Sequence, residues 1–228
     1  FPQSDKASDV TAALLKFLRE NGVEIIYGTR CLGVKRDDGG FKVTTDKGTL
    51  FSRKVIICTG GASYPSTGST GEMFKVIEKL GHAVNPLRPA LCPFILKEKY
   101  VSRLEGLTLK NVGLSAFYGG KKAYNGFGEM LFTRDGISGP IALSLSSHIN
   151  KLELSEITIA LDLKPALDEK ALIDRINRDF LEAKNKFFKN SLGGLLPKSL
   201  IPIIIDLSKI PPQKQVNSVT AEARRALA

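Results

Sequence analysis

The sequence has no tryptophan and is poor in the residues that most often build metal and disulfide sites: among 228 residues there are three cysteines and two histidines. The cysteines, Cys31, Cys58 and Cys92, are odd in number and lack Cys-x-x-Cys spacing, which favours reduced thiols and a cytoplasmic location. Neither histidine lies near other ligands at metal-binding spacing. The sequence therefore predicts no metal site.

Long apolar runs and short catalytic motifs are also absent. The most apolar stretch, Ile201–Leu207, contains Pro202 and Asp206 and is far shorter than the roughly 18 residues of a membrane span. No Gly-x-Ser-x-Gly, His-Glu-x-x-His, P-loop or Gly-x-Gly-x-x-Gly motif occurs. We therefore expect no membrane partner, and no hydrolase built from side-chain acids and bases.

The composition is that of an ordinary globular protein, with 43% hydrophobic and 25% charged residues, and this excludes disorder, collagen and coiled coil. The net charge of +10 divides into +3, +3 and +4 over residues 1–86, 87–165 and 166–228. A phosphate-binding surface normally concentrates its positive charge. The even spread does not favour a nucleic-acid partner.

The first part of the chain has an α/β pattern. Apolar residues from Val10 to Leu18 follow helical spacing behind Ser8, the expected N-cap, and Asn21-Gly22 ends that helix. Further segments with strand character follow it. They are a short strand at 23–27, a meander at 32–36, 41–45 and 49–51, and a buried strand at 54–58 that precedes a helix at 71–80.

The second part is first β-rich and then helical. Three prolines between 86 and 93 predict a crossover. Strands then dominate from 94 to 162, with a hairpin turn at 118–120 and a helix at 138–149. Helical spacing returns at 172–181, and further helices are expected at 197–207 and 216–227.

Glycines between residues 59 and 71 give the strongest functional indication. Thr59-Gly60-Gly61 ends the expected buried strand, and Ser66–Gly71 leads into the expected helix. Glycine lets a ligand approach the backbone, and a helix N-terminus offers free N–H groups to an anion. The pattern favours a nucleotide cofactor over a plain turn.

Several strings resemble the bacterial BaiN-like, or aminoacetone-oxidase-like, FAD-dependent oxidoreductases. The matching segments are Phe1–Val10, Cys58–Gly61, Tyr64–Gly71, Pro86–Leu91, Gly128–Thr133 and Gly136–Pro140. Two positions depart from the family pattern: Glu72-Met73 replaces the usual Asp-Gly, and Arg134-Asp135 replaces a histidine and an aromatic residue.

The resemblance implies that the chain is an internal part of a longer flavoprotein. Residues 1–85 would be the central part of a split, Rossmann-like FAD-binding domain. Residues 86–165 would be the β-barrel-like part of an inserted domain, and residues 166–228 its helical part. The expected fold class is thus α/β plus β, and we expect this chain alone to hold FAD weakly or not at all.

The resemblance also assigns cofactor contacts. Thr59, Gly60 and Gly61 would lie against the adenosine and pyrophosphate of FAD, and the backbone of Cys31 would face the adenine. The remaining assigned residues would lie near the isoalloxazine, and they are Ser4, Asp5, Tyr64, Thr67, Gly68, Ser69, Thr70 and Gly71. Cys31 is equally compatible with a plain buried thiol, and the residues around Ser4 with a solvated lead-in to the first helix.

Two functions remain open. The first is an FAD-dependent oxidoreductase with an unidentified small-molecule substrate, possible use of NAD(P)H and no assigned catalytic side chain. The second is a basic module that contacts RNA or a protein without catalysis, suggested by the net charge of residues 87–228 and ranked lower.

Overall fold

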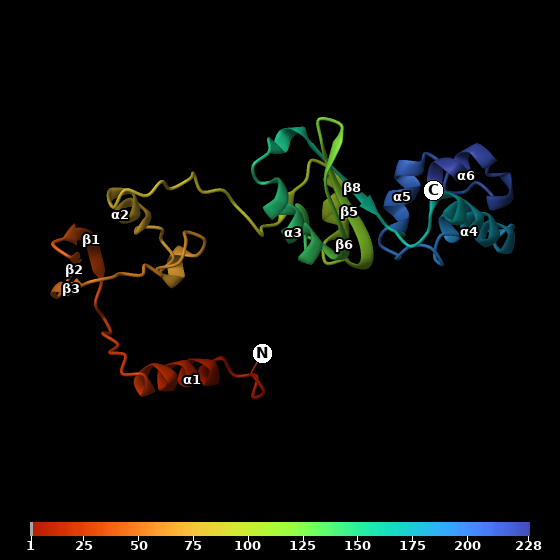
Figure 1. The fold of residues 1–228 in the computed structure, drawn as a ribbon. Helices are drawn as coiled ribbons and strands as arrows, with labels where there is room; N and C mark the ends of the chain where they lie inside the picture. Colours follow the sequence, from red (N-terminus) through yellow and green to blue (C-terminus); the bar gives the residue numbers. More distant parts are fainter. Residues whose placement is uncertain (1) are drawn as a thin grey trace. The chain divides into compact units, whose positions relative to one another are not determined.

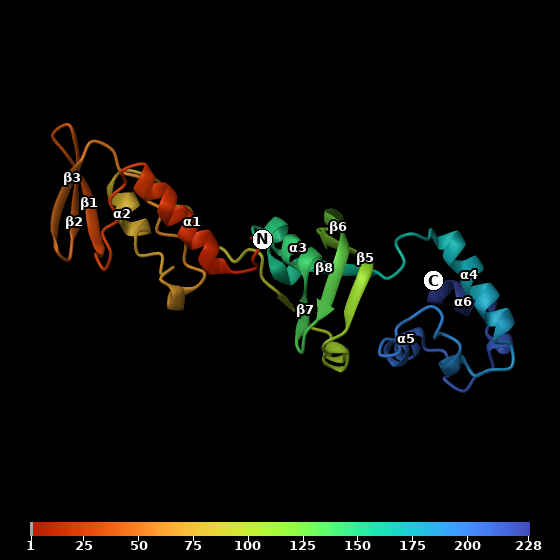
Figure 2. The same ribbon diagram turned by 90° about the horizontal axis from the view of Figure 1, so that it is seen from below.

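The computed structural model describes residues 2–228, and the chain divides after Pro86 into two compact units. We call residues 1–86 the N-terminal unit and residues 87–228 the C-terminal unit. Most of their helices and strands are labelled in Figures 1 and 2.

The first helix of the N-terminal unit, α1 (Ala7–Glu20), confirms the predicted helix but not its cap. Lys6 is the N-cap, because its carbonyl already accepts a hydrogen bond from the Asp9 N–H (3.2 Å). Ser8 lies inside the helix. At the other end Asn21 is the C-cap and Gly22 has φ +69°, as the Asn-Gly pair predicted.

A three-stranded antiparallel meander follows, as predicted, formed by β1 (Cys31–Asp37), β2 (Gly40–Thr45) and β3 (Gly48–Ser52). Its register places Val34 opposite Val43 and Val43 opposite Leu50. Val34 of β1 is buried, and with Met73 it is one of only two buried residues among residues 2–86.

Two predicted strands of this unit are wrong. Residues 23–27 and 54–58 have no strand structure, and Ile56 is 87% exposed. Both segments have the composition of a strand, but a strand needs a neighbouring backbone for its N–H and C=O groups. Within residues 2–86 the only sheet is the meander, which leaves these segments unpaired.

The C-terminal unit begins with an antiparallel five-stranded sheet in the order β4-β7-β6-β5-β8. The bounds are β4 Phe94–Ile95, β5 Thr108–Tyr118, β6 Lys121–Phe132, β7 Gly136–Ser138 and β8 Ile157–Asp162. The hairpin predicted at 118–120 is confirmed: Gly119 and Gly120, both with positive φ, form a two-residue turn between β5 and β6. A short 3-10 helix, Lys99–Leu104, precedes β5.

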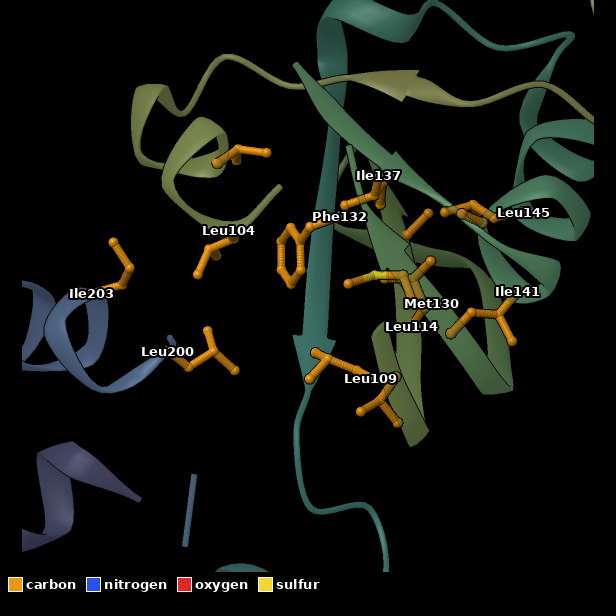
Figure 3. Close-up of a cluster of buried hydrophobic side chains, with 14 of the residues drawn as sticks. Leu104, Leu109, Leu114, Met130, Phe132, Ile137, Ile141, Leu145, Leu200 and Ile203 are labelled. Atoms are coloured by element: carbon orange, nitrogen blue, oxygen red, sulfur yellow. The ribbon is translucent and has the colours of Figure 1, made fainter. Parts of the chain in front are cut away.

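Helix α3 (Pro140–Ile149) confirms the predicted helix and packs on β5, β6 and β7. Its apolar side chains complete a core with Leu114, Met130 and Phe132 of the sheet. Figure 3 shows this core, in which Leu200 and Ile203 from the helical part lie beside Leu104. The sheet and the helical part therefore share buried surface.

The helical part contains α4 (Glu169–Glu182), α5 (Ile201–Ser208) and α6 (Ala221–Leu227), which pack around a second core that includes Ile176 and Phe188. The predicted helix 216–227 is interrupted. Residues 216–218 form a 3-10 turn, and Thr220 begins α6 because its side chain accepts a hydrogen bond from the Ala223 N–H (3.2 Å).

Candidate functional site

The two glycine segments singled out in the sequence lie against each other. We call Thr59–Gly61 the first loop and Tyr64–Gly71 the second loop. A Cβ placed on Gly60 would lie 3.0 Å from the Ser69 Oγ, and one on Gly71 would lie 3.1 Å from the Ala62 Cβ. Both glycines also have positive φ, +76° and +72°. The positive φ angles favour glycine at both positions, and the neighbouring side chains leave little room for a Cβ.

The second loop uses most of its own N–H groups. Pro65–Thr67 form a 3-10 turn, in which Thr67 and Ser69 donate to the Tyr64 carbonyl and Gly68 donates to the Pro65 carbonyl. The N–H of Thr70 bonds to the carbonyl of Gly68 (3.0 Å). The sequence predicted that this loop leads directly into a helix N-terminus at residue 71, and this is wrong, because helix α2 spans only Phe74–Lys79.

The first loop is different. Within residues 2–228, the N–H groups of Thr59, Gly60 and Gly61 have no hydrogen-bond partner in the protein. All three residues are exposed, and a Cβ on Gly61 would meet no atom within 4 Å. These three exposed N–H groups are therefore available to an anionic ligand such as the phosphate groups of a nucleotide.

An ion pair connects the start of β1 with the end of the second loop. The Arg30 guanidinium contacts the Glu72 carboxylate, and the hydrogen bond and charge of that carboxylate raise the pKa of Arg30. The Arg30 N–H also bonds to the Asp46 Oδ1 (2.9 Å). Cys31 follows as a half-buried residue, with its Sγ 3.8 Å from the Gly33 carbonyl.

These contacts bring three of the four predicted site segments together: Cys31, the first loop and the second loop. The fourth segment, Ser4 and Asp5, is exposed and makes local contacts. The Asp5 N–H bonds to the Pro2 carbonyl, and the Ser4 Oγ accepts from the Lys6 N–H (3.4 Å). In residues 2–228 no hydrogen bond or ion pair connects this segment with either loop.

Sequence reasoning missed Arg30, because its partner Glu72 was noted only as a departure from the family pattern. It also missed an apolar groove of about 470 Å³ that shares no residue with the two loops. The groove is lined by Val34, Arg36, Phe41, Val55, Ile57, Ile77, Leu80, His82 and Ala83. Its residues come from four separate segments, so no local pattern could have revealed it.

The described residues, 2–228, include no cluster of three or more possible metal ligands and no helix with the length and hydropathy of a membrane span. The thiols of Cys31, Cys58 and Cys92 form no disulfide bonds.

Two family models match this chain. Residues 88–228 match the HI0933-like protein barrel and H2TH domain, and residues 6–91 match the FAD dependent oxidoreductase family. The two matches meet near the division between the two units after Pro86.

Similar proteins have assigned activities. The 3-dehydro-bile acid delta(4,6)-reductase of Clostridium scindens is 29% identical over 212 residues, covering 92% of this chain and 52% of that protein. A ribosomal RNA dihydrouridine synthase of Escherichia coli is 28% identical over 215 residues, 93% of this chain and 52% of that protein. Its counterpart from Haemophilus influenzae is 34% identical over 156 residues, 68% of this chain and 36% of that protein. The chain thus spans about half the length of the first two relatives and 36% of the length of the third.

Proposed function

The chain belongs to the HI0933-like family, and from this membership we propose that the whole protein is an FAD-dependent oxidoreductase. The resemblance to BaiN-like flavoproteins expected from the sequence is confirmed. The alternative of a binding module without catalysis is not favoured, because residues 6–91 match an oxidoreductase family.

We propose a Rossmann-like arrangement for the FAD-binding domain, with residues 1–85 as its central part. Residues 86–165 and 166–228 would be the barrel-like and helical parts of the inserted domain. The exposed apolar side chains of the N-terminal unit support this proposal. Phe17, Phe51 and Ile56 are each more than half exposed, as expected of surfaces that other parts of a larger domain cover. The free thiols support a cytoplasmic location.

The first loop is the proposed holder of the FAD pyrophosphate. Its three unpaired N–H groups and the open space beside Gly61 suit a phosphate group. These free N–H groups, in a loop that lies against the second loop, are the observation that carries the proposal. The Cys31 backbone would meet the adenine. The second loop, with Tyr64, Thr67, Gly68, Ser69, Thr70 and Gly71, and the segment of Ser4 and Asp5 would lie near the isoalloxazine.

The proposed reaction is reduction of a carbon–carbon double bond conjugated with a carbonyl group. Both activities named for the relatives fit this class: one acts on a 3-dehydro-bile acid at its Δ4,6 double bonds, and the other forms dihydrouridine in ribosomal RNA. When bound, FAD supplies hydride transfer. The other hydrogen arrives as a proton, and we propose NAD(P)H as the source of the electron pair.

In this proposal the residues of this chain bind the cofactor and orient it. The first loop donates hydrogen bonds to the anionic part of the cofactor, while the absence of a Cβ on Gly60 lets the Ser69 side chain of the second loop lie close to the first loop. Because Arg30 is engaged by Glu72, its charge holds the second loop in place rather than binding phosphate directly.

Substitution of Gly61 tests the cofactor site in the whole protein. In Gly61→Ala the added methyl enters open space without positive-φ strain, so we expect unchanged thermal stability. It would displace a phosphate from the first loop. Loss of one hydrogen bond to a charged group costs about 1.5–3 kcal/mol, so we expect FAD affinity to fall about tenfold or more.

Gly33→Ala is the matched control, because a Cβ there also meets no atom within 4 Å and its φ is not positive. FAD dissociation constants are measured by flavin fluorescence. Equal affinity of both variants and the parent would contradict the proposed site.

The reaction class is tested with the flavin-loaded whole protein and NAD(P)H. A 4-en-3-one steroid and an unmodified ribosomal RNA transcript serve as substrates, with mass spectrometry to detect a gain of two hydrogens. Saturation of either double bond supports the proposal. If NAD(P)H reduces the flavin and neither substrate is changed, the conjugated-alkene assignment is wrong.

A further inference from the structure

Positive charge is concentrated in one stretch of the C-terminal unit, although it is even over larger parts of the chain. Between Ala183 and Ala221 there are six lysines, no arginine and a single acidic residue, Asp206. That carboxylate is already paired with the Arg103 guanidinium (3.1 Å). The stretch therefore carries an excess of positive charge that its own acidic residues do not neutralise.

The fold brings the lysines of two loops together. The Phe188 N–H bonds to the Lys214 carbonyl (2.9 Å), and the Val216 N–H bonds to the Lys186 carbonyl (3.1 Å). The Lys189 N–H also bonds to the Pro212 carbonyl (3.1 Å), and Phe187 forms a bridge with Gln215. We call residues 184–189 and 209–216 the basic loop pair. Both loops belong to the helical part, near α4, α5 and α6 in Figure 1.

Some residues of the basic loop pair are buried in the second core, whereas others are exposed to solvent. Phe188 and Val216 are buried at 0% and 2% exposure in the second core, which fixes the backbone. The neighbouring Phe187 is instead 44% exposed, between the exposed residues Lys186 and Lys189. Within residues 2–228, no lysine of the pair lies within ion-pair distance of a carboxylate.

We propose that the basic loop pair binds the phosphate backbone of a folded RNA, with Phe187 stacking on an unpaired base. Clustered lysines without counter-charges bind phosphates, and an exposed ring among them adds base stacking. An anionic membrane would favour several large exposed apolar side chains around the lysines, whereas Phe187 is the one large apolar side chain that is exposed in the two loops, beside Pro211 and Pro212. The identification of RNA as the substrate class rests on the proposed reductase function. The binding of RNA to the loop pair does not itself require the flavin.

The test uses the 228-residue chain and a fluorescein-labelled RNA hairpin with a uridine-containing loop. Binding is followed by fluorescence anisotropy over a range of KCl concentrations. The loop variant is Lys186→Gln/Lys189→Gln/Lys214→Gln. The matched control, Lys97→Gln/Lys110→Gln/Lys151→Gln, removes the same charge from exposed positions of the barrel-like part.

We expect the loop variant to bind at least about tenfold more weakly, and the slope of log affinity against log salt to decrease by about 2. The control variant should bind as the parent does. Phe187→Ala should lose about fivefold or more in affinity without a change in the salt slope, because stacking is not ionic.

Absence of RNA binding at low salt, or equal weakening in the loop and control variants, overturns the proposal. So does binding of phosphatidylserine vesicles by a chain that does not bind the hairpin. Failure here is distinguishable from failure of the proposed reductase, because the FAD affinity of the whole protein and its change in Gly61→Ala are measured separately.

Discussion

Arg30 and Glu72 illustrate how single residues join distant parts of the N-terminal unit. The two side chains lie 42 positions apart and pair at the surface, with exposed fractions of 66% and 46%. The Arg30 guanidinium is charged throughout the usual working pH range, and the hydrogen bond and charge of Glu72 raise its pKa further. The pair therefore holds the second loop near Cys31 without contributing to a buried core.

Breaking this pair should loosen the second loop. In Glu72→Gln the guanidinium loses its ionic partner, and we expect faster amide hydrogen exchange at Thr67, Gly68 and Ser69. The charge-swapped Arg30→Glu/Glu72→Arg variant should recover part of the protection. Unchanged exchange in Glu72→Gln would show that the loop's own 3-10 turn is sufficient to hold it.

Gly136 is a second single residue whose substitution has a predictable effect, here on the stability of the fold. A Cβ at this position would overlap the carbonyl oxygen of Phe94, the residue that pairs with Ile137 across β4 and β7. We expect Gly136→Ala to lower the free energy of unfolding by about 2–3 kcal/mol, measured by urea denaturation.

Gly193→Ala is the control for this substitution. A Cβ there meets no atom within 4 Å and its φ is not positive, so the change should stay within about 0.5 kcal/mol. Similar losses in the two variants would be inconsistent with a steric cause.

At the level of elements, helix starts depend on whether a side chain reaches the first-turn N–H groups. The Asp168 Oδ1 accepts a hydrogen bond from the Ala171 N–H at 2.7 Å and begins α4. Ser8 has the same type of sequence setting, but its hydroxyl lies 3.4 Å from Asp9 and caps no helical N–H group.

These two positions should respond differently to alanine. Asp168→Ala is expected to cost about 1 kcal/mol of unfolding free energy, because it removes an N-cap hydrogen bond. Ser8→Ala should leave the stability within about 0.5 kcal/mol of the parent. The comparison is made by urea denaturation, with helix content followed by circular dichroism. A larger loss at Ser8 would contradict the assignment of Lys6 as the N-cap.

At the level of the whole molecule, the two units differ in how well they bury apolar side chains. Within residues 2–86 only Val34 and Met73 are buried, whereas the C-terminal unit contains two apolar clusters. Hydrophobic burial is the main favourable term in folding, so the N-terminal unit of this chain should open much more readily.

Limited proteolysis checks this difference. We expect chymotrypsin to cut residues 1–86 first and to leave a resistant product within 87–228, identified by mass spectrometry. In the whole protein loaded with FAD, the N-terminal unit should become resistant as well, since ligand binding stabilises the folded state. Equal cleavage rates of the two units in the 228-residue chain would contradict the prediction.

Local patterns predicted the elements whose partners are close in the sequence. The meander of β1, β2 and β3 and the β5–β6 hairpin followed from turn residues between alternating strands. The same reasoning was wrong for 54–58, because an apolar, β-branched segment becomes a strand only where another backbone lies beside it.

The sequence by itself determined the family, the order of most elements and the two glycine loops, because these depend on residue identity and short-range spacing. Only the tertiary structure decided which loop offers free N–H groups, which acid pairs with Arg30, and that the loops of Lys186 and Lys214 are joined by backbone hydrogen bonds. Such facts arise from contacts between residues far apart in the chain, and the free energy of those contacts depends on the packed fold rather than on local pattern.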